Sequence, residues 1–164
     1  MVDSVSTSED SLGLDVDADS TVTSLSVANI TPVAIAGGSR LSGAITVTAG
    51  SLKLTETGTL ASSISMSSGT LDADNSLTVS GTLTQLGNIT IDVLTDKTLT
   101  YSGTAISLGA NTLTLSGGGT FSNTNALVLN DANSLLSLAG ILTIGDVDGT
   151  TASNSVKGLS LIHI

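Results

Sequence analysis

Asn111-Thr-Leu-Thr-Leu-Ser-Gly117 is one of four related stretches that decide the fold. The other three are Asn75-Ser-Leu-Thr-Val-Ser-Gly81, Lys97-Thr-Leu-Thr-Tyr-Ser-Gly103 and the looser Asn133-Ser-Leu-Leu-Ser-Leu-Ala-Gly140. Their leading leucines are Leu77, Leu99, Leu113 and Leu135, so the interval between alternate copies is the same in both cases. A repeat that cannot bury its apolar residues alone must stack on its neighbours, which predicts a solenoid.

Within each copy, apolar residues alternate with serine and threonine. Leu77 and Val79 point to one side of a strand, and the hydroxyl residues between them point to the other. The same register places the only two aromatic residues, Tyr101 and Phe121, in the core. A glycine after each copy turns a corner, and we expect a new inward residue just beyond it. These expected residues are Leu83, Ala105 and Phe121.

The alternation predicts an all-β chain. Further strands are expected at 44–48, 51–54, 64–66, 88–93, 126–129 and 142–144. Only Asp148-Gly149 suits a two-residue hairpin turn, whereas a coiled parallel arrangement needs no hairpins. We therefore predict a β-solenoid, a right-handed parallel β-helix with about 18 to 22 residues per coil. A β-sandwich is the alternative.

Three segments differ in composition. Residues 21–158 form the predicted solenoid. Residues 1–20 are rich in aspartate and glutamate, which suits a frayed edge, a cap or part of a truncated coil. Residues 159–164, Leu-Ser-Leu-Ile-His-Ile, resemble a translated sequencing adapter, which predicts that they contribute nothing to the fold and that the natural protein is longer. His163, the only histidine, is for this reason a poor candidate for chemistry.

Composition excludes several classes of protein. A chain with a net charge of −10 lacks the positively charged surface that a nucleic-acid binder needs. The absence of cysteine excludes disulfides and thiolate metal sites. The first ten residues do not form a signal peptide, and no apolar run is long enough to insert in a membrane. Aromatic residues make up 1% of the chain, so the core must be thin and built from aliphatic side chains.

The repeat style resembles the repetitive passenger regions of bacterial autotransporters and filamentous-haemagglutinin-like adhesins. The resemblance is carried by Ser68-Gly-Thr-Leu71, Ser80-Gly-Thr-Leu83 and Gly109-Ala-Asn-Thr-Leu-Thr-Leu-Ser-Gly117, and it extends from about Ser42 to Gly145. It implies a secreted, surface-displayed β-helix and carries over no catalytic residue. The expected function is a non-catalytic stalk or adhesive segment of a large extracellular protein, with a host-surface, matrix or glycan ligand. The open ends of a solenoid also predict end-to-end self-association.

Acidic pairs and triplets are the candidate metal ligands. Asp15, Asp17 and Asp19 would share one side of an extended strand and offer hard oxygen ligands to Ca²⁺. Asp146 and Asp148, like Asp72 and Asp74, are two-carboxylate versions of this pattern. None of these stretches has the spacing of a known calcium loop, so the preferred interpretation is solvated acidic loops with no metal and no cofactor.

Two alternative functions follow from other residues. Threonine pairs separated by one apolar residue are typical of an ice-binding solenoid, and they occur at Thr21/Thr23, Thr46/Thr48, Thr82/Thr84, Thr98/Thr100 and Thr112/Thr114. A fragment of a β-helix enzyme acting on polysaccharides would need paired carboxylates in a cleft and aromatic sugar platforms. The basic residues are scattered and both rings are predicted to be buried, so we predict that the chain is not an enzyme. Those basic residues are Arg40, Lys53, Lys97 and Lys157.

Overall fold

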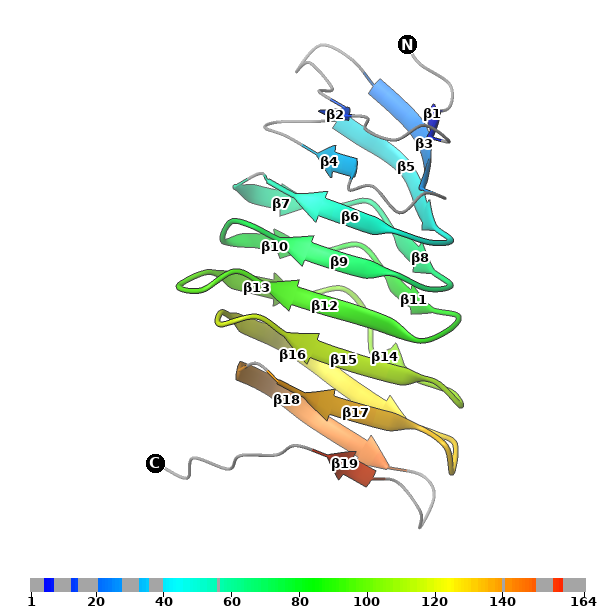
Figure 1. Cartoon of the computed structure of the whole chain (residues 1–164), viewed down its shortest axis with the longest axis vertical. Coiled ribbons are helices and arrows are strands. Elements are labelled where there is room, and N and C mark those ends of the chain that lie inside the picture. The colour runs from blue at the N-terminus through cyan, green and yellow to red at the C-terminus, as the bar shows by residue number, and fades with distance from the viewer. Residues whose placement is uncertain are drawn as a thin grey trace.

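The structure, a computed structural model, describes strand segments within residues 1–42, residues 43–139 except 56, and the strands at 141–149 and 155–157. Side chains are described for residues 26, 43–55 and 57–139. The described part is all-β and contains no helix (Figure 1). The expectations for residues 1–20 and 159–164 fall almost entirely on residues outside this description.

The described residues form nineteen short strands, and those expected from the sequence are present. The strands are β1 (Val5–Thr7), β2 (Gly13–Leu14), β3 (Thr21–Val27), β4 (Val33–Ile35), β5 (Arg40–Val47), β6 (Ser51–Leu54), β7 (Gly58–Leu60), β8 (Ile64–Met66), β9 (Thr70–Ala73), β10 (Leu77–Val79), β11 (Leu83–Gln85), β12 (Ile89–Val93), β13 (Thr98–Tyr101), β14 (Ile106–Ser107), β15 (Thr112–Ser116), β16 (Thr120–Leu129), β17 (Leu135–Leu138), β18 (Ile141–Gly149) and β19 (Ser155–Lys157).

The strands form three sheets that run along the molecule. The front sheet, which faces the viewer in Figure 1, has the order β2-β4-β6-β9-β12-β15-β17-β19. The rear sheet has the order β7-β10-β13-β16-β14, with β18 also paired to β16. The side sheet has the order β1-β3-β5-β8-β11. All strand pairs between described residues are parallel.

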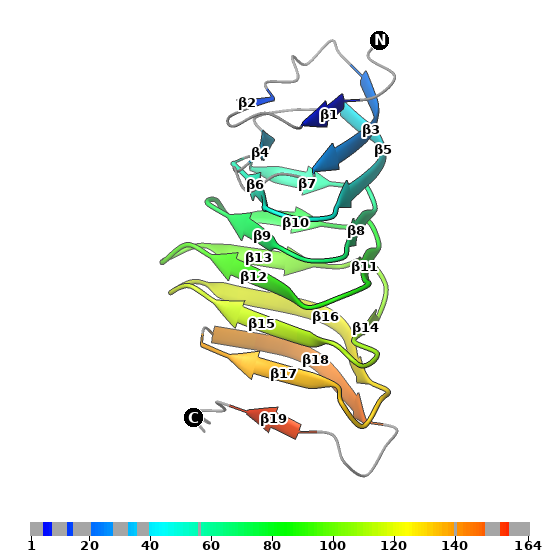
Figure 2. The ribbon, with the colours of Figure 1, turned by 45° about the vertical axis from the view of Figure 1, so that its right-hand side comes forward.

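The chain visits the three sheets in turn, as β6, β7 and β8 do before β9 begins the next coil. In Figure 1 the front strands run to the left, and the chain returns to the right through the rear sheet while it descends from the N-terminus; Figure 2 shows the same path from the side. This path is a right-handed parallel β-helix, as predicted. The β-sandwich alternative is wrong, because its hairpins require antiparallel pairs.

Inward residues one coil apart stack into columns. In the front sheet one column contains Leu52, Leu71, Ile91, Leu115 and Leu138. The intervals from Leu52 to Leu71 and from Leu71 to Ile91 fall within the predicted coil length, whereas the two later intervals exceed it. Each strand of this sheet from β6 to β15 alternates buried with partly exposed residues, so the aliphatic core is continuous along the stack.

The four repeated stretches do not form one column. Leu77 pairs with Leu99 in the rear sheet, whereas the copies that begin at Asn111 and Asn133 pair with each other in the front sheet. The fourth copy is shifted by one residue, because Leu113 pairs with Leu136 and not with Leu135. The regular interval between alternate copies is therefore not a coil length.

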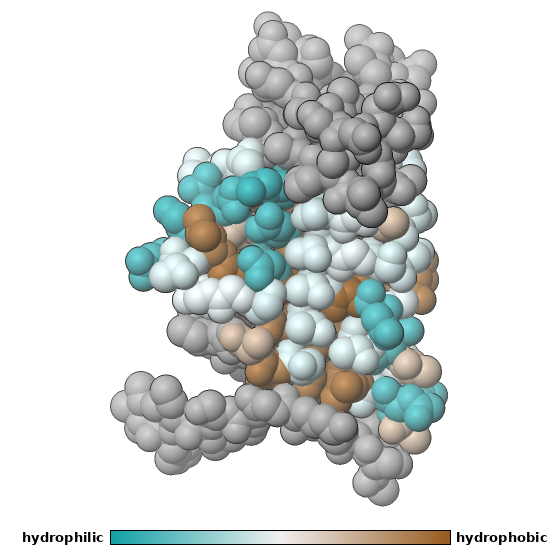
Figure 3. All heavy atoms as spheres, in the orientation of Figure 1, coloured by the Kyte–Doolittle hydropathy of each residue, from teal (hydrophilic) through white to brown (hydrophobic). Residues whose placement is uncertain are grey.

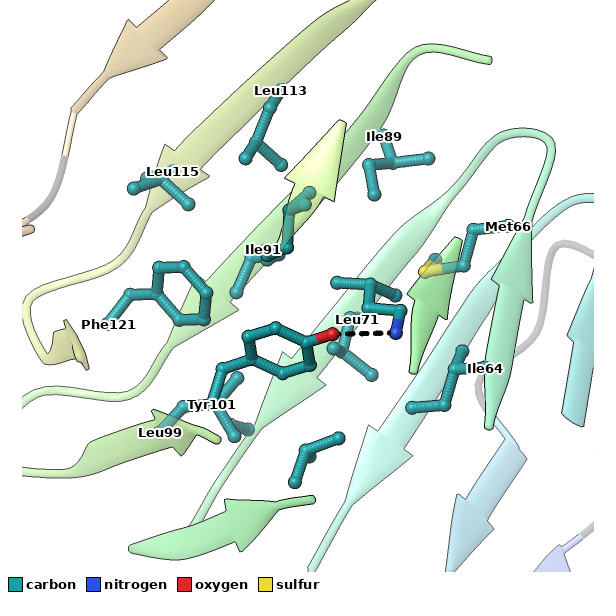
Figure 4. Close-up of a cluster of buried hydrophobic side chains, with 14 of the residues drawn as sticks. Ile64, Met66, Leu71, Ile89, Ile91, Leu99, Tyr101, Leu113, Leu115 and Phe121 are labelled. Atoms are coloured by element: carbon teal, nitrogen blue, oxygen red, sulfur yellow. Dashed lines mark hydrogen bonds between the residues drawn. The ribbon is translucent and has the colours of Figure 1, made fainter. Parts of the chain in front are cut away.

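Tyr101 and Phe121 lie in the core, as predicted, with only 1% and 2% of their surface exposed (Figure 4). Leu83 is also buried, but the prediction for Ala105 was wrong. Ala105 is exposed and Ile106 is buried instead, because Ile106 pairs with Leu127 of β16 and so sets the inward register of that segment.

Glycines at the corners allow the coils to approach closely. Gly117 has a φ of 84°, and a Cβ built there would lie 2.1 Å from the carbonyl oxygen of Val93 one coil earlier. At Gly103 the conformation is not left-handed, but a Cβ would lie 2.2 Å from the carbonyl oxygen of Gly81. The corners thus need glycine for two reasons, backbone conformation and the small distance between stacked coils.

We expect Gly117→Ala to lower the free energy of unfolding by about 2 kcal/mol or more, since left-handed backbone and a clash with the adjacent coil act together. Gly58→Ala is the matched control, because Gly58 also has a positive φ (116°) but a Cβ at this position would meet no atom within 4 Å. Urea unfolding of both variants measures the difference. A Gly117→Ala loss no larger than that of Gly58→Ala would contradict the close packing of this corner.

Candidate functional site

Each sheet carries a column of outward hydroxyl residues. The columns are Ser51, Thr70, Thr90, Thr114 and Ser137 in the front sheet, Thr59, Thr78, Thr100 and Ser122 in the rear sheet, and Ser26, Thr46, Ser65 and Thr84 in the side sheet. Figure 3 views the front sheet, where side chains of near-neutral hydropathy run down the face between hydrophilic groups. The hydroxyls therefore follow the register of the coils on every side of the molecule.

The predicted threonine pairs do not share one face. Thr46 and Thr84 lie in the side sheet, Thr100 in the rear sheet and Thr114 in the front sheet. A single flat array built from these five pairs, as an ice-binding face would need, is therefore absent from the described strands. The other positions of each column are filled by hydroxyl residues outside the predicted pairs, and these residues were not identified from the sequence.

The rear sheet has a uniform hydroxyl surface. Beside its central column a second column contains Thr98 and Thr120, and the Thr98 N–H donates to Ser76 Oγ at 3.1 Å. The outward residues of β10 and β13 and of Thr120–Ser122 in β16 are all serine or threonine. The face thus presents a charge-free grid of hydroxyl groups over three successive coils.

The front sheet differs because its second outward column is charged. It contains Lys53, Asp72, Asp92 and Ser116 in register. Lys53 Nζ lies 2.8 Å from Asp74 Oδ2 and 3.7 Å from Asp72 Oδ2, and the Ser116 hydroxyl donates to Asp92 Oδ1. These contacts engage Asp72 and Asp74, one of the two-carboxylate patterns in the sequence, and Asp72 lies in strand β9 rather than in the expected acidic loop.

The pKa values of two of these groups, Asp72 and Lys53, are raised for different reasons. Partial burial is the main cause that raises the pKa of Asp72, and repulsion from Asp74 adds to it despite the nearby Lys53 ammonium. The hydrogen bond to Asp74 raises the pKa of Lys53. The cluster is therefore an ion pair centred on Lys53 and Asp74, with Asp72 held in a less favourable position.

The structure does not assemble a calcium site from the residues it describes. No group of three or more His, Cys, Asp or Glu side chains in the described part could hold a metal ion. Asp146 and Asp148 lie in β18, where they pair with Ala126 and Val128. Asp15, Asp17 and Asp19, like His163, lie outside the described residues.

A pocket of about 280 Å³ opens between β11 and β14. It is lined by Thr82, Leu83, Thr84, Gln85, Ala105, Ser107 and Gly109. This lining holds no carboxylate, amine or imidazole, so it offers no group that could act as a general acid or base at neutral pH. Gln85 pairs with Met66 and is itself buried, so its side chain belongs to the core rather than to the surface.

Sequence reasoning missed the pairing of Lys53 with Asp72 and Asp74. The signal was present, since Lys53 and Asp72 are separated by the same interval as their neighbours Leu52 and Leu71. Two residues of opposite charge that are one coil apart in the sequence lie side by side on adjacent strands.

In the described part, no helix is long and apolar enough to cross a membrane.

We expect Asp72→Asn to raise the thermal unfolding midpoint slightly at pH 7, by an amount worth less than about 1 kcal/mol. The raised pKa of Asp72 means that the folded protein binds its proton more tightly than the unfolded chain does. The group therefore stabilises the fold below its unfolded pKa, and this contribution is lost as the pH rises through the folded pKa. The gain should vanish near about pH 3, where Asp72 is largely protonated in both states.

Asp74→Asn is the matched control, because it removes the 2.8 Å contact with Lys53 and should not raise the midpoint at pH 7. If Asp72→Asn destabilises the protein at pH 7 as much as Asp74→Asn does, the ion pair is not centred on Lys53 and Asp74. Calorimetry at the two pH values measures both variants.

Comparisons of the chain with protein-family models, with curated proteins and with solved structures give no match. The geometry of the outer faces, the ion pair and the pocket is therefore what bears on function.

Proposed function

We propose that this chain is a non-catalytic structural segment, a stalk or adhesive fibre, of a large secreted bacterial surface protein. The observation that carries the proposal is the unbroken parallel stacking of the front and rear sheets from β6 and β7 to β17 and β18. A stack of this kind gains length with each added coil while it keeps the same core, which suits a spacer.

Three further features support this function. The aliphatic columns extend through every coil with described side chains, so the core is a continuous rod and not a shell around a site. The outward surface is rich in hydroxyl groups, which can contact a glycan or matrix ligand without a large apolar patch. The repeat-style resemblance over Ser42–Gly145 points to surface-displayed fibres and hence to an extracellular location.

A display experiment tests this proposal. The chain is placed between a cell-surface anchor and a fluorescent reporter. A Gly/Ser linker of the same length, 164 residues, is the control. A β-helix rises about 4.8 Å per coil and is much stiffer than a Gly/Ser linker, which behaves as a random coil. We expect a narrow distribution of reporter heights for the chain and a broad one for the linker.

Adhesion is measured on the same cells, on surfaces coated with mucin glycans or with collagen. Retention above that of the linker cells would assign the adhesive role, and a narrow height distribution without retention would assign the stalk role. Identical heights and identical retention for the two sets of cells would contradict both.

A second candidate, ice binding, is favoured by the charge-free grid of the rear sheet. Neighbouring strands are about 4.8 Å apart and alternate residues along a strand are about 6.7 Å apart, so the hydroxyl groups form a regular two-dimensional lattice. Such a lattice can align water molecules in the manner of an ice surface. The front sheet lacks this property because Lys53, Asp72 and Asp92 interrupt its hydroxyls.

Ice binding predicts thermal hysteresis and faceted ice crystals in a solution of the chain. Thr100→Lys should abolish both, because it places a charged side chain in the centre of the rear grid. Thr90→Lys, at the equivalent place in the front column, should leave both unchanged. Round crystals and no hysteresis with the unsubstituted chain would reject this candidate.

A further inference from the structure

The side sheet stops partway down the stack while the other two sheets continue. Its last strand is β11, and the segment below it, β14, pairs instead with the end of β16 through Ile106 and Leu127. Figure 2 shows β8, β11 and β14 along the same side of the molecule. At this level β12 pairs with β15 in the front sheet and β10 pairs with β13 in the rear sheet. Only the side sheet is therefore interrupted.

One hydroxyl oxygen takes the place of the missing strand pairing. The Leu83 N–H donates to Tyr101 Oη at 2.9 Å (Figure 4), and the Thr104 N–H donates to the same oxygen at 3.1 Å. The opposite edge of β11 is paired normally, since the Thr82 carbonyl oxygen accepts from Ile64 N–H and Leu86 N–H donates to Met66. Tyr101 therefore links β11 to the coil below, and the Gln85 side chain adds a second link, because its Nε2 donates to the Thr112 carbonyl oxygen at 2.9 Å.

The core beside this break is unusually polar. Among the described side chains, the buried atoms without a hydrogen-bond partner are Gln85 Oε1 and Asn123 Nδ2. Gln85 lies in β11, and Asn123 pairs with Tyr101. A buried polar atom without a partner destabilises its surroundings by about 1–3 kcal/mol. The pocket of about 280 Å³ lies at the same place, so side chains do not fill the space between β11 and β14.

The length of a coil changes at the same level. Above the break, the side chains of Ser68 and Asn75 each donate to a carbonyl oxygen one coil away, 20 positions earlier in the chain. Below it, Ser116 bonds to Asp92, 24 positions earlier. The long strand β16 pairs with both β13 and β14, so one strand of the rear sheet replaces the separate side strand. The molecule thus consists of two stacks with different coils, joined through the front and rear sheets.

We propose that the break is a hinge, at which the two stacks pivot about the continuous front and rear sheets and open or close the groove between β11 and β14. The hydroxyl of Tyr101 is the latch that holds the groove closed. Bending concentrates here because two sides are held by ladders of backbone hydrogen bonds, whereas the third is held by hydrogen bonds of the Tyr101 and Gln85 side chains. This inference does not depend on the proposed surface function.

Native-state hydrogen exchange on the full chain tests the latch. In the unsubstituted chain, the Leu83 and Thr104 amides should exchange faster than front-sheet amides at the same level, such as that of Ile91. Tyr101→Phe should raise exchange at Leu83 and Thr104 about five- to tenfold, the effect of one hydrogen bond, and leave Ile91 unchanged. Thr100→Val, which removes an outward hydroxyl from the same strand, should change none of them.

Equal protection of Leu83, Thr104 and Ile91 in the unsubstituted chain would overturn the latch, and so would a uniform rise across both stacks in Tyr101→Phe. Spin labels test the pivot directly, because the chain has no cysteine of its own. Labels at Ser65→Cys and Val128→Cys span the break, and labels at Thr70→Cys and Thr114→Cys span the front sheet. A broader distance distribution for the first pair supports the hinge, and equally narrow distributions contradict it.

Discussion

The stacking of inward aliphatic residues in register is the constraint from which the other features of this structure follow. Leu52, Leu71 and Ile91 occupy one column, so the residues on either side of them must also recur at the strand spacing. Outward hydroxyls then stack on hydroxyls, and Lys53 lies beside Asp72. The close contact of Gly117 with Val93 at a corner has the same cause. Each of these features is a consequence of one coil lying directly on the next.

The sequence was sufficient to predict the strands and the class of fold. Alternation of apolar and hydroxyl residues is a local signal, and Ser51–Leu54 and Ile64–Met66 form the strands that it indicates. Tyr101 and Phe121 lie in the core because they occupy inward positions of the same alternation. The parallel coil followed from the lack of hairpin turns together with the repeat.

The registers between coils could not be predicted, because they depend on how many residues each corner contains. The fourth repeated stretch is displaced by one residue, so Leu136 rather than Leu135 pairs with Leu113. Ala105 is exposed for a related reason, since its segment aligns with β16 and not with β11. The Lys53 ion pair was missed for the same reason, because the predicted coil length included the interval between Lys53 and Asp72 but did not single it out.

The outer faces and the break separate the functional proposals from one another. A column of hydroxyls occurs on all three sheets, so it meets the general need of a strand that faces water and does not by itself indicate a ligand. The rear sheet extends the column into a charge-free grid, which is what ice binding requires. A stalk requires only the stack, and the hinge that we propose at Tyr101 would set how stiff that stack is.

Cross-strand nuclear Overhauser effects between backbone protons measure the stacking of the coils without reference to any side chain. Parallel stacking requires contacts between residues one coil apart in the same sheet, such as Thr70 with Thr90 and Thr90 with Thr114 in the front sheet, and we expect to observe them. Contacts of antiparallel type between strands adjacent in the sequence, such as β9 with β10, would contradict the parallel β-helix.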